Sequence, residues 1–302
     1  QMQSLVNCLA FSQPDFENDE TISEVKPQLR PKLWPRTVIT LDRFDIPFSL
    51  VGEHLVLTIV YDMPDAIQSI PWSRFSKWGV SFSEALRIAF DNVAPPSTFV
   101  GVNRKGDGPG HCSAATSDNY DGARFLIDMP YTIYDIDYPR WAFPASRDAC
   151  GMCQADRPAD IEFNIDLMLE MSDADPKPLP PFPLVNYGEG WFNWHPEAGS
   201  PAARMLARRQ FDYQLDVHRW QTSYLQSTAD ERNDFALVES LMANAGSQTS
   251  DEPKSATKWW IDCECLLPTA DFVIFPDHHG LKFAWDDVMK ICGDRLMPAE
   301  AL

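Results

Sequence analysis

The stretch at residues 54–93 reads HLVLTIVYDMPDAIQSIPWSRFSKWGVSFSEALRIAFDNV, and it contains most of the signals that decide the fold. Its first residues form a β-branched apolar run that ends at Met-Pro-Asp, which is typical of a strand followed by a turn. Ser81 begins a Ser-x-x-Glu capping box for a helix. The apolar residues of that helix recur on one stripe, formed by Ala85, Leu86, Ala89, Phe90 and Val93. A strand followed by an amphipathic helix indicates a protein of mixed α and β structure.

Further along the chain, the patterns predict more strands and two more helices. Strands are expected at YTIYDID (131–137) and at RWAFPASRDA (140–149), while DGARFLI reads as either helix or strand. Residues 200–227 form the clearest long helix, with Ser200 as its cap and Pro201 at the first helical position. Two hairpins and a final helix follow, at residues 235–264, 271–285 and 286–292. The predicted class is therefore α+β, with antiparallel or mixed sheets covered by helices.

Two segments in opposite halves of the chain resemble each other. VYDMPDAIQSIPWSRFSKWG and VIFPDHHGLKFAWDDVMKICG both read as a strand, a Pro/Asp turn, a second strand and a short helix that ends at glycine. The matched pairs are Trp72 with Trp285, Phe75 with Val288, and Lys77 with Lys290. We therefore expect two related halves, each with a hairpin closed by a helix and a Trp filling the corner.

The charge balance excludes two classes of partner. Lys and Arg number 25 against 44 Asp and Glu, which gives a net charge of −19. A sequence-independent nucleic-acid binder needs a basic face, and so does a protein that docks on an anionic membrane. We therefore expect neither nucleic acid nor a membrane as a partner.

The cysteines and the ends of the chain favour a cytoplasmic location. Seven cysteines are an odd number and too few for a disulfide scaffold. No apolar run is long enough to span a bilayer, and the N-terminal residues lack the basic segment that begins a secretory signal. Reduced thiols in a cytosol are the simplest interpretation.

Composition divides the chain into four segments. Residues 1–36 are polar and contain several prolines, so they are predicted to form an extended arm. Residues 37–172 form an α/β half. The proline- and tryptophan-rich segment 173–199 reads as a linker. Residues 200–302 form a C-terminal half of a helix and hairpins, which we expect to pack on the first half.

Residues 50–165 also resemble a known family. The residues that carry the resemblance are 55–93, quoted above, then SDNYDGARFLI (117–127) and WAFPASRDA (141–149). In this order they resemble the uncharacterised bacterial YtpQ-like family of unknown function. The resemblance implies a cytoplasmic bacterial α/β protein without an assigned reaction. The chain departs from the family after Asp148, where ACGMC takes the place of an apolar strand.

Cys150 and Cys153 have the Cys-x-x-Cys spacing of redox pairs. Together with Cys263 and Cys265 they would supply four thiolates, a ligand set that zinc accepts. Structural zinc, however, usually takes two Cys-x-x-Cys knuckles, and Cys263 and Cys265 lack that spacing. ACGMC is also as apolar as a buried strand, so core cysteines are favoured and a thiol switch at Cys150 and Cys153 stays an alternative.

Asp277, His278 and His279 form the most conspicuous polar cluster. Histidine titrates near neutral pH and binds metals, so a metal-dependent or other hydrolase would use this turn, with His111 as a further candidate. The same residues suit an ordinary hairpin turn, in which Asp and Gly take turn positions. The turn is the favoured interpretation, and the hydrolase stays an alternative.

Arg124, in the segment Tyr-Asp-Gly-Ala-Arg, is a candidate ligand-binding residue. It would also pair with Asp121 or Asp128, which lie within a helical turn of it. No catalytic set converges elsewhere, so the sequence predicts no catalytic residue and no cofactor.

The loop 187–197 is rich in aromatic residues, which are enriched at the energetic centres of protein interfaces. Its candidate contact residues are Trp191, Phe192, Trp194 and His195. The favoured interpretation is a non-enzymatic interaction or accessory protein, which binds an unknown protein partner through this loop and the proline-rich segment.

Overall fold

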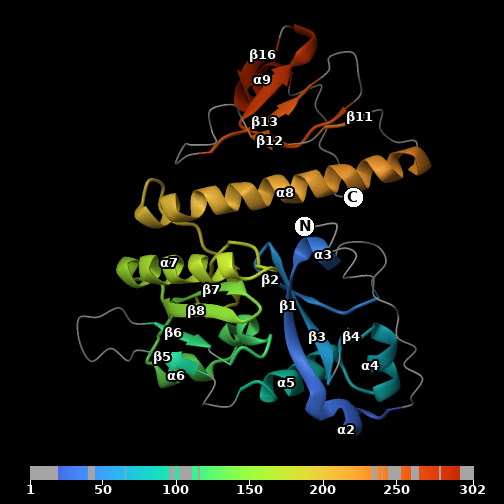
Figure 1. Ribbon diagram of the computed structural model, residues 1–302, viewed down its shortest axis with the longest axis vertical. Coiled ribbons are helices and arrows are strands. Elements are labelled where there is room, and N and C mark those ends of the chain that lie inside the picture. The colour runs from blue at the N-terminus through green and yellow to red at the C-terminus, as the bar shows by residue number, and fades with distance from the viewer. Residues whose placement is uncertain are drawn as a thin grey trace.

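The computed structural model describes residues 20–39, 45–64, 66–94, 99–101, 111–114, 116–232, 237–239, 241–243, 253–259, 265–278 and 280–292. In these ranges the chain forms several antiparallel or mixed sheets with helices packed against them (Figure 1). The predicted α+β class is confirmed.

The first sheet is built around a long strand, β3 (Leu55–Met63). β1 (Leu29–Pro35) pairs with one edge of β3, while β2 (Ser49–Val51) and β4 (Ala66–Ser69) pair with successive parts of the other edge, all antiparallel. β1 accommodates two prolines because it lies at the edge of the sheet, where a missing N–H breaks no ladder. Short helices flank β1, namely α2 (Ile22–Val25), η1 (Lys26–Gln28) and α3 (Arg36–Ile39).

Two helices cover one face of this sheet. α4 (Trp72–Trp78) ends at Gly79, and α5 (Phe82–Asp91) begins with the predicted capping box. The Ser81 N–H donates to Glu84 Oε2 at 2.8 Å, and the Glu84 N–H donates to Ser81 Oγ at 3.2 Å. The core beneath them contains Val25, Leu29, Ile59, Ile70, Phe75, Ala85, Ile88 and Ala89.

The second sheet has six strands in the order β10-β9-β7-β8-β6-β5, and neighbouring strands are antiparallel. The bounds, in that order, are Trp191–Asn193, Leu184–Asn186, Arg140–Ser146, Ala149–Gln154, Cys112–Ala114 and Phe99–Gly101. β7 and β8 are buried on both faces, which explains why their sequences are almost continuously apolar.

Separate cores lie on the two faces of this second sheet. On one face, α7 (Pro158–Ala174) packs on β7 and β8. On the other face, η3 (Asp121–Leu126) and α6 (Met129–Ile133) close a core that joins the two sheets, since it contains Leu57 of β3 beside Met152 of β8.

The long helix α8 (Pro201–Arg232) lies between these sheets and the C-terminal strands (Figure 1). Ser200 caps it as predicted, because its Oγ accepts the Ala203 N–H at 3.1 Å. The predicted hairpin 271–285 forms as β15 paired to β16. The other predicted hairpin, 235–264, forms only in part, because β12 pairs with β13 while β11 pairs in parallel with β14. The C-terminal elements are β11 (Leu237–Val238), β12 (Met242–Ala243), β13 (Ser255–Lys258), β14 (Cys265–Leu266), β15 (Phe272–Phe275), η5 (Pro276–His278), β16 (Leu281–Ala284) and α9 (Trp285–Cys292).

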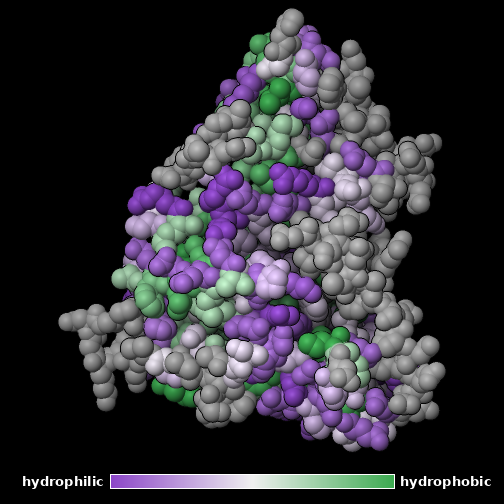
Figure 2. Space-filling model, viewed as in Figure 1, coloured by the Kyte–Doolittle hydropathy of each residue, from purple (hydrophilic) through white to green (hydrophobic). Residues whose placement is uncertain are grey.

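The surface follows this layering. Figure 2 shows a band of hydrophilic residues where α8 crosses the molecule, and hydrophobic residues at the tip where Figure 1 places β16 and α9. Among the helices of the described ranges, none combines the length and the apolar composition that a bilayer crossing requires.

The structure adds detail to two of the expected segments. The described part of 1–36 is extended from Leu29 to Pro35, where it forms strand β1, pairs along β3 and buries Leu29 and Leu33. Within the predicted linker 173–199, β9 and β10 belong to the second sheet. In both cases the apolar residues between the prolines are buried, and the prolines stand where no ladder hydrogen bond is lost.

YTIYDID is not the predicted strand, since α6 occupies its first residues. Pro130 is the second residue of this helix, where its missing N–H breaks no helical hydrogen bond. Tyr131 is buried and its hydroxyl donates to the Phe125 carbonyl at 2.9 Å, which fixes the helix against η3. The alternation of apolar and polar residues therefore reflects one short helical turn and the turn that follows it.

The two similar segments have the same order of elements, β3-β4-α4 and β15-β16-α9. The matched residues Phe75 and Val288 are both buried, but Trp72 is 50% exposed. The residue that packs against the hairpin is therefore not the Trp but the one three positions later, about one helical turn further along the helix. A common origin of the two halves stays a prediction.

Candidate functional site

Arg124 lies at the centre of a buried polar network and is only 1% exposed. Its Nε donates to the Val93 carbonyl at 2.8 Å, and its Nη2 donates to Asp118 Oδ2 at 2.6 Å. Its Nη1 donates to Asp118 Oδ1 at 2.9 Å, to Thr116 Oγ1 at 2.8 Å and to Asp121 Oδ1. Such a set of charge-assisted bonds fixes the guanidinium in one orientation.

The loop before η3 folds around the Asp121 carboxylate. Asp121 Oδ2 accepts the N–H groups of Thr116 and Ser117 at 3.0 and 2.8 Å, and Oδ1 accepts the Thr116 hydroxyl at 2.6 Å. Ser117 and Asn119 have positive φ angles of 53° and 73°. These bonds stabilise a tight loop that non-glycine residues seldom adopt.

The turn between β7 and β8 holds this loop in place. The Asn119 N–H donates to Asp148 Oδ1 at 2.6 Å, and the Gly122 N–H donates to the Arg147 carbonyl at 3.0 Å. A Cβ at Gly122 would lie 2.3 Å from the backbone oxygen of Ser146, so only glycine allows this approach. The segment that carries the family resemblance is thus packed directly on the turn that follows it.

The network is a closed ion-pair cluster. Burial raises the pKa of Asp118, but the hydrogen bonds and charge of Arg124 outweigh it and leave the pKa below its ordinary value. Burial lowers the pKa of Arg124, and the bonds to Asp118 and Asp121 raise it by more. The candidate ligand arginine is therefore committed to internal partners. Asp128, its other expected partner, pairs instead with Arg140 at 2.5 Å.

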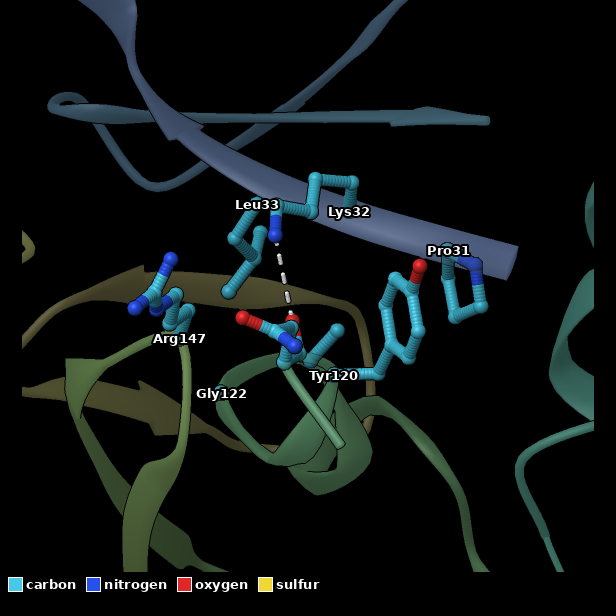
Figure 3. Close-up of a pocket in the computed structure, with 8 residues that line it drawn as sticks. Pro31, Lys32, Leu33, Tyr120, Gly122 and Arg147 are labelled. Atoms are coloured by element: carbon cyan, nitrogen blue, oxygen red, sulfur yellow. Dashed lines mark hydrogen bonds between the residues drawn. The ribbon is translucent and has the colours of Figure 1, made fainter. Parts of the chain in front are cut away.

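A small hollow lies beside the network, between β1 and the loop (Figure 3). It holds about 160 Å³ of empty space, part of it open to solvent, and is lined by Pro31, Lys32, Leu33, Asn119, Tyr120, Gly122, Ala123 and Arg147. Lys32 is 7% exposed, and its Nζ points from β1 toward the loop, where it donates to the Asn119 carbonyl at 3.2 Å. The same Nζ lies 5.3 Å from the ring centre of Tyr120 and 5.6 Å from that of Trp34.

Burial and the positive charge of Arg147 lower the pKa of Lys32 to about 8. Asp148 and Asp62 act in the opposite direction. The ammonium is thus held by aromatic rings, a carbonyl and nearby carboxylates, in a place that burial makes unfavourable for charge.

Sequence reasoning did not identify Lys32 or Arg147 as site residues. Lys32 bonds to a residue 87 positions away, and its burial depends on the pairing of β1 with β3. The only signal in the sequence is a lysine placed directly before the apolar pair Leu33-Trp34.

The structure separates Cys150 and Cys153 rather than bringing them together. Cys150 lies in the core between the two sheets, while Cys153 lies in the core under α7. Residues three apart in a strand point to opposite faces. Burial raises the pKa of both thiols, which disfavours the thiolate. Cys263, needed for the zinc set, lies outside the described residues.

Asp277 and His278 are exposed in η5, between β15 and β16, and His279 lies outside the described residues. His111 belongs to a different sheet, directly before β6, where burial lowers its pKa. Within the ranges that the structure describes, no group of three or more His, Cys, Asp or Glu side chains is placed to hold a metal ion.

Two of the predicted contact residues anchor the β9–β10 hairpin. Trp191 packs edge-to-face on Phe125 with 4.8 Å between ring centres, and Trp194 packs edge-to-face on Trp141 at 6.0 Å. The hairpin is thereby fixed to cores on both faces of the second sheet.

Other residues of the same hairpin face solvent. Phe192 is 51% exposed, Tyr187 is 65% exposed, and His195 is exposed. Phe192 lies opposite the buried Val185 in the ladder, at the open edge of the six-stranded sheet. The hairpin therefore presents aromatic side chains on a backbone that its tryptophans hold rigid.

Comparison of the chain with models of known protein families, with curated proteins and with solved structures finds no match. The resemblance of residues 50–165 to the YtpQ-like family therefore stays a prediction from the residues.

Proposed function

We propose that this protein is a non-enzymatic binding protein that contacts a protein partner through the β9–β10 hairpin. The observation that carries the proposal is the exposure of Tyr187 and Phe192, each more than half, on a hairpin that Trp191 and Trp194 anchor. Aromatic side chains held in place lose little entropy on binding, which is why they dominate interface energetics. Tyr187 and Phe192 are thus the contact residues, while the two tryptophans support them.

Charge suggests the nature of the partner. Glu189 lies at the tip of the hairpin, Glu197 follows β10, and Glu53 is tied to the hairpin through its N–H, which donates to Asn193 Oδ1 at 3.0 Å. The chain as a whole carries a net charge of −19. Because opposite charges steer association, a basic segment of another protein is the partner that fits.

The alternatives have less support from the geometry. A thiol switch at Cys150 and Cys153 needs two sulfurs on one face, and these lie on opposite faces of β8. A hydrolase at Asp277 and His278 needs further groups to converge on an exposed turn. A cytoplasmic bacterial setting is part of the proposal on the basis of the sequence alone.

Site-specific photocrosslinking tests the proposal. A benzophenone amino acid replaces Phe192 in the full chain, and as a matched control it replaces Trp72, which is also half exposed. We expect one dominant protein adduct at position 192 in cells that express the chain, and none of it at position 72. Tyr187→Ser should reduce that adduct, and raised salt should reduce it further because the partner is basic.

Equal adducts at positions 72 and 192, or the absence of a defined adduct at 192, would contradict the proposal. So would an adduct that persists unchanged after Tyr187→Ser. Circular dichroism of each variant verifies that the fold is retained before the adducts are compared.

A further inference from the structure

Two cationic side chains from distant segments share the small hollow. Lys32 comes from β1 and Arg147 from the turn between β7 and β8, and both line the same space (Figure 3). After burial, the charge of Arg147 is the largest cause of the lowered pKa of Lys32. Lys32 and Arg147 repel each other, and an anion bound between them would be stabilised by both charges.

The two cations retain hydrogen-bonding capacity. Lys32 has three N–H donors, and among the described residues it bonds to the Asn119 carbonyl alone, at 3.2 Å. Arg147 Nε is buried without a hydrogen bond within that same part of the chain, and its distance to Asp148 Oδ2 is 3.5 Å. A buried donor without an acceptor is costly, so an acceptor supplied by a ligand would be favourable here.

The nearby carboxylate is already committed. Asp148 Oδ1 accepts the Asn119 N–H at 2.6 Å, and its Oδ2 forms an ion pair of 3.5 Å with Arg147 Nε. The Arg147 side chain is 38% exposed, so its outer end is reachable from solvent. The hollow is therefore lined by one buried cation and one partly exposed cation.

We propose that the hollow formed by Lys32, Asn119, Tyr120, Gly122 and Arg147 binds one phosphate group, either inorganic phosphate or the terminal phosphate of a small molecule. Lys32 and Arg147 supply the positive charge for a phosphate, in competition with Asp148 and Asp62, the two carboxylates near Lys32. A compact ammonium and a planar guanidinium donate to different oxygens of a tetrahedral group. The space is small and partly open to solvent, so the hollow would enclose only part of the phosphate and the outer oxygens would face water. This site goes beyond the proposed function, and its test needs no protein partner.

Affinity should depend on the charge of Lys32. The groups that face it are Arg147 and Asp148 from the turn, Asp62 from β3 and Lys177, and its Nζ lies 5.3 Å from the ring centre of Tyr120. Because the ammonium loses its proton near pH 8, we expect phosphate binding to weaken as the pH rises through that value.

Phosphate binding to the full chain tests the site. The measurements are ³¹P line broadening and the midpoint of thermal unfolding at neutral pH, against sodium chloride of matched ionic strength. We expect a saturable rise in the midpoint with inorganic phosphate, and binding weakened by about tenfold or more in Arg147→Gln, the loss of one charge-assisted contact. Arg87→Gln is the matched control, since Arg87 pairs with Asp91 on the surface and lies outside the hollow.

Methyl phosphate separates the two sources of the phosphate group. Binding equal to that of inorganic phosphate supports free phosphate as the ligand, and tighter binding supports the phosphate end of a larger molecule. A midpoint rise no greater than that in sodium chloride overturns the proposal. An equal rise in the Arg147→Gln variant and in the native chain also overturns the proposal. Because Arg147 is partly exposed, Arg147→Gln should fold even if Lys32→Met does not.

Discussion

A single buried guanidinium balances two carboxylates in the loop before η3. Asp121 is fully buried and Asp118 is partly exposed, and both bond to Arg124. The desolvation of three charges is tolerable only because nearly every polar atom finds a donor or an acceptor. The orientation of the loop, and with it the hollow beside β1, therefore depends on Arg124.

Replacing Arg124 with Met should destabilise the protein strongly. The variant leaves the Asp121 carboxylate buried without its cation, which typically costs about 3–5 kcal/mol of the free energy of unfolding. Urea unfolding followed by circular dichroism measures the loss. Arg87→Met provides the comparison, because its partner Asp91 is exposed and surface pairs contribute little. An Arg124→Met variant no less stable than Arg87→Met would show that the network is dispensable.

Lys32 should make stability rise with pH above 8. Its pKa is about 8 in the folded chain and near 10.5 when unfolded, so between these values the folded state has released a proton that the unfolded state still holds. Stability rises with pH wherever the unfolded state binds more protons. Relative to Lys32→Met, the native chain should gain about 2 kcal/mol of unfolding free energy between about pH 8 and pH 10. If the free energy of unfolding, measured in urea, changed with pH in the same way in both proteins, this account of Lys32 would be refuted.

Elements with local signals were predictable from the sequence, and those set by distant contacts were not. The capping box at Ser81, the cap at Ser200 and the hairpin from β15 to β16 depend on neighbouring residues, and all three form as predicted. The helix α6 was missed because its side chains pack on η3 rather than on a strand neighbour. The hollow was missed for the same reason, since it joins β1 to residues more than eighty positions later.

The approach of α7 to β8 depends on the absence of a side chain at Gly151. A Cβ there would lie 2.8 Å from Asn164 Oδ1 and 3.1 Å from Met168 Cγ. Gly151→Ala should therefore destabilise the protein by about 1–3 kcal/mol, the usual cost of overpacking. Asn164→Ala in the same chain removes the closest clash, so the double variant should lose less than the sum of the two single changes. Additive losses in thermal or urea unfolding would mean that the helix shifts freely away from the strand.

On the scale of the whole molecule, α8 connects two bodies of unequal size. Its N-terminal part contributes Ala202 and Leu206 to the core under α7. Further along, Phe211 and Leu215 meet Leu241 and Ala270 in a core that is much smaller than those of the two main sheets. A small core buries less apolar surface, so the C-terminal sheet should open more easily than the rest.

Hydrogen exchange measures this difference directly. Amides in β13 and β15 should exchange faster than those in β7 and β8, because local opening there disrupts fewer buried contacts. Leu215→Ala removes one side of the small core, a type of change that costs about 2–5 kcal/mol, and should accelerate exchange in β13 and β15 by more than about tenfold while leaving β7 and β8 unchanged. Leu206→Ala on the same helix is the matched control, since it contacts the core under α7 and should accelerate β7 and β8 instead. If each substitution accelerates all four strands alike, the chain unfolds as one cooperative unit and α8 transmits stability between the two bodies.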